Sequence, residues 1–280
     1  MQWVVSSTTA CFYLLLTAHC LLKIMLEKIK VEDVVAIAKQ AGEVIMEIYA
    51  KDFEVEFKAD ESPLTEADQN ANALIEAELN KLNAELGLDI PILSEEGKHL
   101  SYEERKDWQA FWLVDPLDGT KEFVKKNDEF TVNIALIEKG VPVLGVVYGP
   151  ALGVTYQAKK GEGAFKDGQK LPIESTSENF NIVASRSHMS AETQQFIDAI
   201  ETDKPKEIVS IGSSLKLCLV AEGAADVYPR LGPTMEWDTG AAHAVVLEAG
   251  KKLEKFSFEK GYQPHPYNKE NLLNSWFVVH

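Results

Sequence analysis

The most informative stretch of the chain reads Phe111-Trp-Leu-Val-Asp-Pro-Leu-Asp-Gly-Thr120. Its first four residues are continuously apolar, which is typical of a strand buried on both faces of a sheet. Asp115 and Pro116 then form a turn dipeptide, so the strand is expected to stop there at a loop. The stretch therefore predicts an internal strand that delivers two carboxylates, Asp115 and Asp118, to its end.

Helices and strands are expected to alternate on both sides of this strand. Residues 26–49 carry apolar side chains at three- and four-residue spacing, which predicts an amphipathic helix. A second helix is expected at 66–86, with Thr65 as its N-cap and Gly87 directly after its end. Short strands are predicted at 91–93, 131–137, 141–148 and 154–158. In the second half, strands at 182–185, 208–211 and 226–229 are expected to alternate with helices at 191–200, 213–222 and 239–249, the last followed by Gly250.

This mixture of helices and strands, without an internal repeat, predicts an α/β (α+β) fold built in layers. The turn-rich residues 161–168 are expected to lead from one lobe to the other. The N-terminal α+β lobe is predicted at 26–160 and carries most of the candidate metal ligands. The C-terminal α/β lobe, residues 161–280, is expected to complete the metal and substrate site. No low-complexity linker separates the lobes, so they are expected to share an interface.

The composition excludes several classes of protein. The chain has 280 residues, 45% of them hydrophobic, and a formal net charge of −16, which excludes a wholly disordered chain. The acidity argues against binding to nucleic-acid polymers or to membrane surfaces, because both normally need a basic face. A small anionic substrate is still compatible with it if metal ions supply local positive charge. Cys11, Cys20 and Cys218 form no CxxC motif, which favours a reducing compartment.

The N-terminal segment, residues 1–25, is expected to lie outside the fold. Residues 1–22 carry no Lys, Arg, Asp or Glu, so the apolar run at 11–16 has no preceding basic residue of the kind that signal peptides have. The polar Ser6-Ser-Thr-Thr9 leaves too few apolar residues for a spanning helix. The favoured interpretation is that the functional chain starts at Met25. An export or anchor segment and an ordered structural role are the alternatives.

Six acidic residues at expected turns are the candidate catalytic groups. They are Asp68, Glu95, Glu96, Asp115, Asp118 and Asp238. Carboxylates at strand ends are how proteins hold Mg²⁺, which prefers oxygen ligands and keeps waters that a phosphate can displace. Pro116 restricts the backbone, so both aspartates and the Leu117 carbonyl could converge on one pair of ions. Gly119 would let a backbone approach closely, and free N–H groups at a following helix start would suit a phosphate.

Each of these residues also has an ordinary structural explanation. Asp-Pro and Asp-Gly are common turn dipeptides, Asp238 could cap a helix, and Glu95-Glu96 could lie in a solvated loop. The sequence contains no GxSxG, GxxxxGK[ST] or HExxH motif that would favour another chemistry. Together, the six carboxylates therefore favour a two-metal phosphoester hydrolase.

Three segments resemble the signature motifs of the inositol monophosphatase superfamily, the lithium-sensitive Mg²⁺-dependent sugar phosphatases. They are Ser94-Glu-Glu96, Trp112-Leu-Val-Asp-Pro-Leu-Asp-Gly-Thr120 and Trp237-Asp-Thr-Gly-Ala241. Four further segments are similar to the 3'(2'),5'-bisphosphate nucleotidases of the CysQ type. They are Asp118-Gly-Thr-Lys-Glu-Phe123, Ser185-Arg-Ser-His188, Gly212-Ser-Ser-Leu-Lys216 and Tyr228-Pro-Arg230. The resemblance runs from about Leu26 to the C-terminus.

The resemblance implies a layered αβαβα sugar-phosphatase fold of two lobes, with two or three Mg²⁺ ions between them. Glu95, Asp115 and the Leu117 carbonyl would hold the first ion, and Asp115, Asp118 and Asp238 the second. The resemblance also implies that Glu96 positions a metal-bound water, while Asp68 and Thr120 orient and deprotonate the attacking water. The implied substrate-binding residues are Glu95, Leu117, Asp118, Gly119, Thr120, Ser185, His188, Ser213, Lys216 and Asp238.

The implied reaction is direct in-line attack of an activated water on phosphorus, without a phosphoenzyme. The favoured substrate is adenosine 3',5'-bisphosphate, together with its sulfated form. Hydrolysis of the bisphosphate to AMP would link the chain to sulfate assimilation. A cationic Lys216 near a helix start is electrostatically unfavourable unless an anion lies nearby, which supports a role at the 5'-phosphate. The structural alternatives are that Ser213 caps a helix, that Lys216 is solvated, and that His188 lies on a surface loop.

Two other functions remain open at this stage. One is an inositol monophosphatase or fructose-1,6-bisphosphatase of the same superfamily, and the other is a non-catalytic sensor of bisphosphate nucleotides. The expected partner is a small nucleotide bisphosphate and no nucleic-acid polymer. A homodimer is compatible with the sequence. The expected location is the cytoplasm, with at most a peripheral contact on the cytoplasmic side of the inner membrane.

Overall fold

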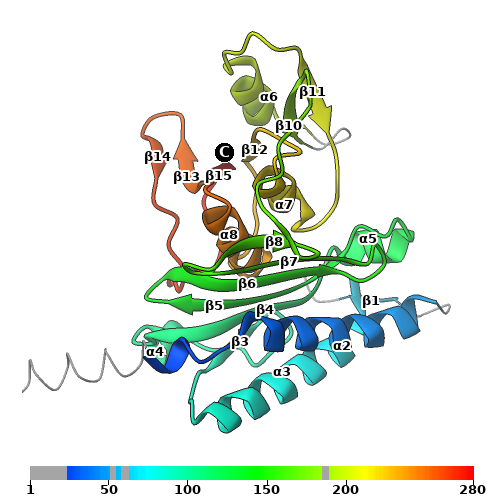
Figure 1. Ribbon diagram of the computed structural model, residues 1–280, viewed down its shortest axis with the longest axis vertical. Helices are drawn as coiled ribbons and strands as arrows, with labels where there is room; N and C mark the ends of the chain where they lie inside the picture. The colour runs from blue at the N-terminus through cyan, green and yellow to red at the C-terminus, as the bar shows by residue number, and fades with distance from the viewer. Residues whose placement is uncertain (1–23, 51–54, 58–62, 185–188) are drawn as a thin grey trace, which may run out of the picture.

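The computed structural model describes residues 24–50, 55–57, 63–184 and 189–280 (Figure 1). Its centre is a seven-stranded sheet in the order β3-β4-β5-β6-β7-β8-β9, in which β3 pairs parallel with β4 and the other neighbours pair antiparallel. These strands are β3 (Ile92–Ser94), β4 (Ala110–Asp118), β5 (Thr131–Glu138), β6 (Val141–Gly149), β7 (Val154–Lys159), β8 (Gly163–Lys166) and β9 (Gln169–Lys170).

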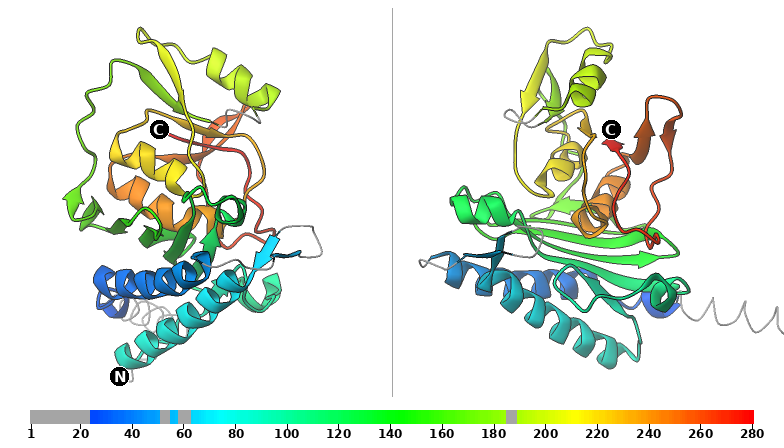
Figure 2. Two further views of the ribbon diagram at one scale, coloured as in Figure 1. Left: turned by 90° about the vertical axis from the view of Figure 1, so that its right-hand side faces the viewer. Right: turned by 180° about the vertical axis from the view of Figure 1, so that it is seen from behind.

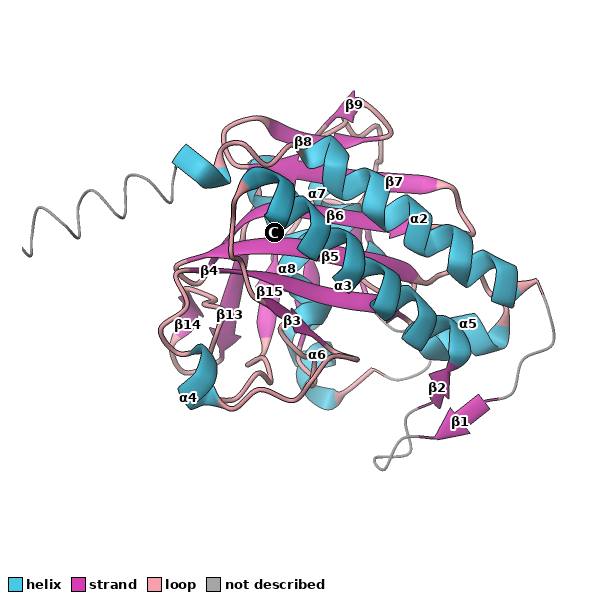
Figure 3. Ribbon diagram, turned by 90° about the horizontal axis from the view of Figure 1, so that it is seen from below, coloured by secondary structure: helices cyan, strands magenta, loops and turns pink. Residues whose placement is uncertain are grey.

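Helices cover both faces of this sheet, which explains why residues 110–114 of β4 are continuously apolar. Trp112 and Val114 pack with α2 (Val31–Tyr49) and α3 (Glu66–Leu86), the two helices that cross one face in Figure 3. Phe111 and Leu113 point the other way, toward α7 (Leu215–Glu222) and α8 (Trp237–Glu248). Successive side chains of a strand face opposite sides, so a strand between two helical layers must be apolar at every position.

A second sheet lies beyond α7 and α8 (Figure 2). Its order is β12-β15-β13-β14, and the parallel pair β10 and β11 continues it through a bridge between Ile182 and Val227. The bounds are β10 (Phe180–Val183), β11 (Lys206–Val209), β12 (Tyr228–Arg230), β13 (Leu253–Ser257), β14 (Gly261–Gln263) and β15 (Phe277–Val279). On its outer side, α6 (Ala191–Asp198) packs through Phe196 and Ile197. The predicted αβαβα layering is therefore confirmed.

Four short elements complete the described chain: β1 (Val55–Phe57), β2 (Pro63–Thr65), α4 (Tyr102–Arg105) and α5 (Thr120–Lys125). None of the helices in the described ranges combines the length and the apolar character needed to cross a bilayer. The first 23 residues, on which the start-site prediction depends, lie outside the described part of the chain. The division into lobes at 26–160 and 161–280 stays a prediction.

Several expected boundaries were wrong. The first long helix starts at Val31 rather than at Leu26, because Lys30 is extended at φ −87° and ψ 138°. The strand through Phe111 continues to Asp118, with a register shift between Asp115 and Asp118 instead of a loop. Half of the turn-rich segment 161–168 is β8, which pairs with β7. The pattern also gave no sign of the second sheet's three C-terminal strands, β13, β14 and β15.

The central helix α8 approaches the sheet closely because of a glycine. A Cβ atom at Gly145 of β6 would overlap the Ala241 carbonyl oxygen and come within 2.8 Å of the Ala244 side chain. The absence of a side chain at Gly145 thus allows the helix backbone to lie directly on the strand. Because Asp238 belongs to the first turn of this helix, the same contact determines how far Asp238 stands from the carboxylates of β4.

We expect Gly145→Ala to lower the free energy of unfolding by about 1–3 kcal/mol, the usual cost of forcing a methyl group into a closely packed interior. Urea unfolding monitored by circular dichroism measures this. Gly232→Ala is the matched control, because the nearest atoms to a Cβ there lie 4.0 Å away and belong to the Arg230 side chain. Equal stability losses in the two variants would contradict the close approach.

Candidate active site

Three carboxylates from different elements meet at one end of β4. Glu95, Asp115 and Asp238 each offer an oxygen, and these oxygens all lie within 4.8 Å of one another. Glu95 directly follows β3, and its N–H donates to the Val114 carbonyl of β4 at 3.1 Å. Parallel pairing of Ser94 with Val114 therefore sets Glu95 beside Asp115. Asp238 belongs to the other half of the chain and lies in the first turn of α8.

The segment after Asp115 is an irregular turn held by its own polar groups. The Asp115 carboxylate accepts a hydrogen bond from the Leu117 N–H at 3.1 Å. The Thr120 hydroxyl donates to the Leu117 carbonyl at 3.4 Å. Gly119 has φ +91°, a left-handed conformation that costs glycine little, and α5 starts directly after it. This irregular segment, which spans the end of β4 and the start of α5, brings Asp115, Leu117, Asp118 and Thr120 together.

Asp238 is held by the backbone at the start of α8. Its Oδ2 atom accepts a hydrogen bond from the Met235 N–H at 2.9 Å. The preceding Glu236 is fully buried and pairs with the Lys269 ammonium at 2.6 Å. Glu236 also accepts hydrogen bonds from the backbone N–H groups of Asn268 at 2.7 Å and of Lys269 at 3.0 Å. The C-terminal loop therefore anchors the helix start that carries Asp238.

The electrostatics of the site show that the carboxylates affect one another. Burial, followed by the negative charges of Glu95, Asp118, Asp238 and Asp68, raises the pKa of Asp115 well above its usual range. Burial and the neighbouring Asp118 raise the pKa of Asp238 to about 8. Carboxylates at this spacing cannot all ionise unless a cation compensates them. Oxygen donors of this kind suit a hard divalent cation, so the cluster could hold a metal ion.

Asp68 and Glu96 lie on the N-terminal side of the site. Asp68 is 1% exposed in the first turn of α3, and its charge contributes to the raised pKa of Asp115. Glu96 is half-buried in the turn directly after Glu95. The structure therefore brings Asp68 close to the acidic cluster although Asp68 stands 27 positions before Glu95 in the sequence.

Asp118 is held by two residues that the sequence analysis missed. Its Oδ2 atom lies 2.7 Å from the Ser214 hydroxyl and 3.5 Å from the Asn133 amide nitrogen. Asn133 carried a detectable signal, because it is a polar residue inside the otherwise apolar strand 131–137. Ser214 carried none beyond its place in the Gly212-Ser-Ser-Leu-Lys216 segment.

The predicted substrate residues of the second half lie at the start of α7. Ser213 is buried with φ +48°, and its carbonyl accepts a hydrogen bond from the Lys216 ammonium at 3.3 Å. Lys216 lines a cavity of about 130 Å³, together with Ser190, Thr193, Tyr228 and Arg230. The Arg230 charge lowers the pKa of Asp238, so this residue too belongs near the acidic cluster. Ser185 and His188 lie outside the described residues.

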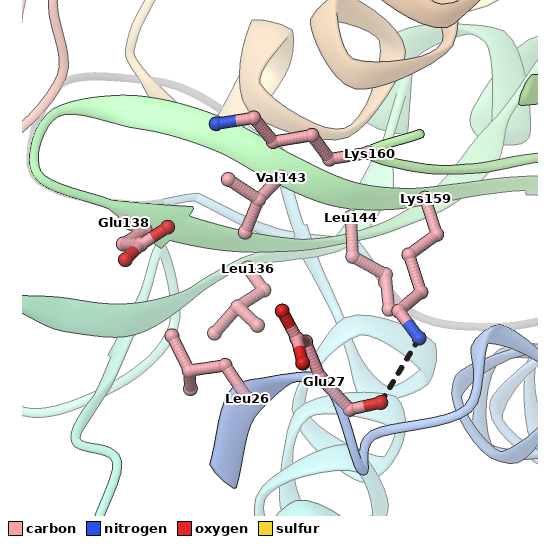
Figure 4. A pocket seen from close by; sticks show the side chains of 8 residues that line it. All are labelled: Leu26, Glu27, Leu136, Glu138, Val143, Leu144, Lys159 and Lys160. Carbon is pink, nitrogen blue, oxygen red and sulfur yellow. Dashed lines mark hydrogen bonds between the residues drawn. The ribbon is translucent and has the colours of Figure 1, made fainter. Parts of the chain in front are cut away.

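A separate cavity of about 230 Å³ lies far from these carboxylates (Figure 4). Half of its eight lining residues are apolar, among them Leu26, Leu136 and Leu144, and the other half are charged. Lys159 donates across its rim to the Glu27 carbonyl at 3.2 Å. Glu138 lines it at the end of β5, whereas Asn133 lies near the start of that strand. The cavity therefore lies at the opposite end of the strands from the acidic cluster.

Comparison with known proteins agrees with this geometry. The chain belongs to the inositol monophosphatase family, whose model matches residues 26–274. It is 45% identical to the 3'(2'),5'-bisphosphate nucleotidase CysQ of Escherichia coli O157:H7 over 89% of this chain and 98% of that protein. It is 46% identical to the Salmonella typhimurium protein of the same name, with the same coverage. The crystal structure of CysQ from Bacteroides thetaiotaomicron superposes with a TM-score of 0.78 at 44% identity, covering 89% of this chain and 96% of that chain.

The raised pKa of Asp238 predicts how the metal-free protein responds to pH. Between its ordinary pKa of 3.8 and its folded pKa of about 8, the folded state keeps a proton that the unfolded state has released. Stability is therefore lost as pH rises through this window. Urea unfolding in EDTA should show a free energy of unfolding that falls from about pH 6.5 to about pH 8.5. The window starts at pH 6.5 because burial lowers the pKa values of His243 and His265 to about 3. Below pH 6.5 these two groups make stability rise with pH, which would mask the effect of Asp238.

Asp238→Asn supplies the control, because the amide keeps the shape but does not titrate. Its stability should fall less steeply over the same window. Mg²⁺ should stabilise the unsubstituted protein more at the upper pH than at the lower, since the cation then displaces fewer protons. A profile that is identical in the two proteins would contradict the assignment of the shift to Asp238.

Proposed function

We propose that this protein is a Mg²⁺-dependent phosphatase that hydrolyses adenosine 3',5'-bisphosphate, and its sulfated form, at the 3'-phosphate. The observation that carries the proposal is the group of Glu95, Asp115 and Asp238 oxygens within 4.8 Å of one another. Its support is the 45% identity to 3'(2'),5'-bisphosphate nucleotidases along 89% of the chain. The product from the bisphosphate is AMP, which retains the 5'-phosphate.

The proposed metal ligands are the groups that already converge at the end of β4. One Mg²⁺ would be held by Glu95, Asp115 and the Leu117 carbonyl. A second would be held by Asp115, Asp118 and Asp238. The proposal is for two or three ions in all. When bound, such ions lower the pKa of a water and neutralise charge on the leaving oxygen. The carboxylates of this chain supply the oxygen donors for that role and are brought together by the pairing of β3 with β4.

The proposed water-activating pair is Asp68 and Thr120. Asp68 is a buried carboxylate whose charge reaches Asp115, so it can accept a proton next to the reacting phosphate. Thr120 carries its hydroxyl toward the Leu117 carbonyl and would orient the attacking water in line with the bond that breaks. Glu96, in the turn after β3, would position a further water. Attack of that water on phosphorus would break the bond to the 3'-oxygen and release phosphate and AMP, with no covalent bond to the protein at any stage.

The proposed nucleotide site is the cavity beside Lys216. Lys216 is the second residue of α7, where a cation is unfavourable unless an anion is bound nearby. The 5'-phosphate, remote from the reacting 3'-phosphate, would supply that anion. Arg230 lines the same cavity, and the Ser213 carbonyl contacts the Lys216 ammonium. Gly119 would lie on the side of the reacting phosphate. Ser185 and His188 are part of the proposal from the sequence alone.

The partner in this proposal is a small nucleotide bisphosphate and no nucleic-acid polymer. A polymer would meet a chain of net charge −16, whereas one small anion can be compensated locally by metal ions. A homodimer, a cytoplasmic location and peripheral membrane contact stay predictions from the sequence.

A phosphate-release assay tests the function. The protein, dialysed against EDTA and supplied with Mg²⁺, should release phosphate from adenosine 3',5'-bisphosphate at a far higher kcat/KM than from inositol 1-phosphate. Omitting Mg²⁺ should abolish release. Preference for inositol 1-phosphate would assign the chain to the sugar-phosphate branch of the family. Tight nucleotide binding without any release would indicate a sensor.

Lys216→Ala tests the nucleotide site. A charge-assisted hydrogen bond contributes roughly 1.5–3 kcal/mol, so kcat/KM for adenosine 3',5'-bisphosphate should fall by about 10- to 150-fold. The rate on 3'-AMP, which lacks the 5'-phosphate, should change little, because the carboxylates are untouched. Equal losses on the two substrates would show that Lys216 has a structural role instead.

A further inference from the structure

The hydroxyl of Ser214 joins parts of the chain that are distant in sequence. Its Oγ atom lies 2.7 Å from Asp118 Oδ2, 2.7 Å from the Asp238 carbonyl oxygen and 2.9 Å from Asn133 Nδ2. Ser214 and Asn133 are each 1% exposed, so water does not compete for these contacts. One buried hydroxyl thus connects β4, β5, the start of α7 and the start of α8.

The hydrogen-bonding groups determine which way the hydroxyl proton points. Asn133 must turn its NH₂ group toward Ser214 and Asp118, because its carbonyl oxygen would be repelled by the Asp118 carboxylate. Ser214 therefore accepts from Asn133 and has a single proton to donate. Its two nearby acceptors are a carboxylate and a neutral carbonyl, and the charged acceptor forms the stronger bond. The proton points to Asp118.

The backbone around Ser214 is held so that the hydroxyl keeps this position. The Gly212 N–H donates to the Glu129 carboxylate at 2.7 Å, and a Cβ at Gly212 would meet the Glu129 carbonyl oxygen at 2.7 Å. Ser213 has φ +48°, an uncommon conformation for a residue with a side chain. The loop is thus packed directly against the segment that leads into β5, and it presents Ser214 from a defined backbone.

We propose that Ser214 and Asn133 are positioning residues that orient the Asp118 carboxylate for metal binding. Both contact Oδ2 of Asp118, which would leave Oδ1 for the ion. The inference deepens the proposed function and rests on Asp118 being a ligand. Since Ser213 and Lys216 flank Ser214 at the start of α7, the Ser214 hydroxyl would also connect the proposed nucleotide-binding segment to a proposed metal ligand.

The test measures the affinity of the protein for Mn²⁺ in the absence of substrate. Electron paramagnetic resonance quantifies the Mn²⁺ that stays unbound. Ser214→Ala should weaken Mn²⁺ binding by about 10- to 100-fold, the usual effect of removing a hydrogen-bond partner of a metal ligand. Ser213→Ala is the matched control from the next position, because no hydrogen bond links its hydroxyl to Asp118 in the described part of the chain. It should leave the Mn²⁺ affinity within about twofold while raising the KM for the nucleotide.

Two further variants separate positioning from general damage to the fold. Ser214→Thr keeps the hydroxyl and should restore Mn²⁺ affinity. Asn133→Ala should weaken binding in the same direction, and the double variant with Ser214→Ala should be little weaker than Ser214→Ala alone, because both act through one chain of hydrogen bonds. Melting temperatures in EDTA verify that each variant is folded.

Unchanged Mn²⁺ affinity in folded Ser214→Ala, or equal weakening in Ser213→Ala, would overturn the proposal. Additive losses of Mn²⁺ affinity in Asn133→Ala and Ser214→Ala would overturn the inference that both residues act through one chain of hydrogen bonds. These outcomes are distinct from failure of the proposed function. In that case the unsubstituted protein would release no phosphate from the bisphosphate, whereas the comparison of metal affinities would still be measurable.

Discussion

The structure depends on holding carboxylates that repel one another. Glu95, Asp115 and Asp238 offer oxygens within 4.8 Å, and burial raises the cost of charging Asp115 and Asp238 further. Nothing local would keep them there, since each belongs to a different element. The parallel pairing of β3 with β4 and the packing of α8 on the sheet supply the necessary energy. Such an arrangement is unfavourable in the metal-free protein and becomes favourable when a divalent cation replaces the protons.

The layering of the fold serves this constraint. An internal strand between two helical layers has few alternative positions, so β4 delivers Asp115 and Asp118 reproducibly. Helix α8 lies between the two sheets, and the missing side chain at Gly145 lets its backbone touch β6. The ion pair between the half-buried Lys269 and the fully buried Glu236 then holds the first turn of that helix through the C-terminal loop. Loss of Lys269 would leave the buried Glu236 charge uncompensated.

The same reasoning explains the polar residues around the cluster. Asn133 and Ser214 are buried, yet their hydrogen bonds are directed at Asp118, so that a strand, a loop and a helix start share one network. Low local dielectric strengthens such bonds and raises the cost of losing any member. Ser213 and Lys216 flank Ser214 at the start of α7. In the proposed function, metal binding and nucleotide recognition would therefore use residues that are adjacent in the chain.

The sequence by itself determined the layered class of the fold, most of the helices, the strand through Phe111, and the acidic residues of the site. These follow from short-range signals: apolar periodicity, turn dipeptides and carboxylates at strand ends. It did not show that α2 begins at Val31 or that residues 253–279 contribute three strands, because such boundaries depend on what the segment packs against. Only the tertiary structure brought Ser214 and Asn133 to Asp118. They stand 96 and 15 residues from it along the chain, and their contacts depend on sheet register and helix placement, which long-range packing decides.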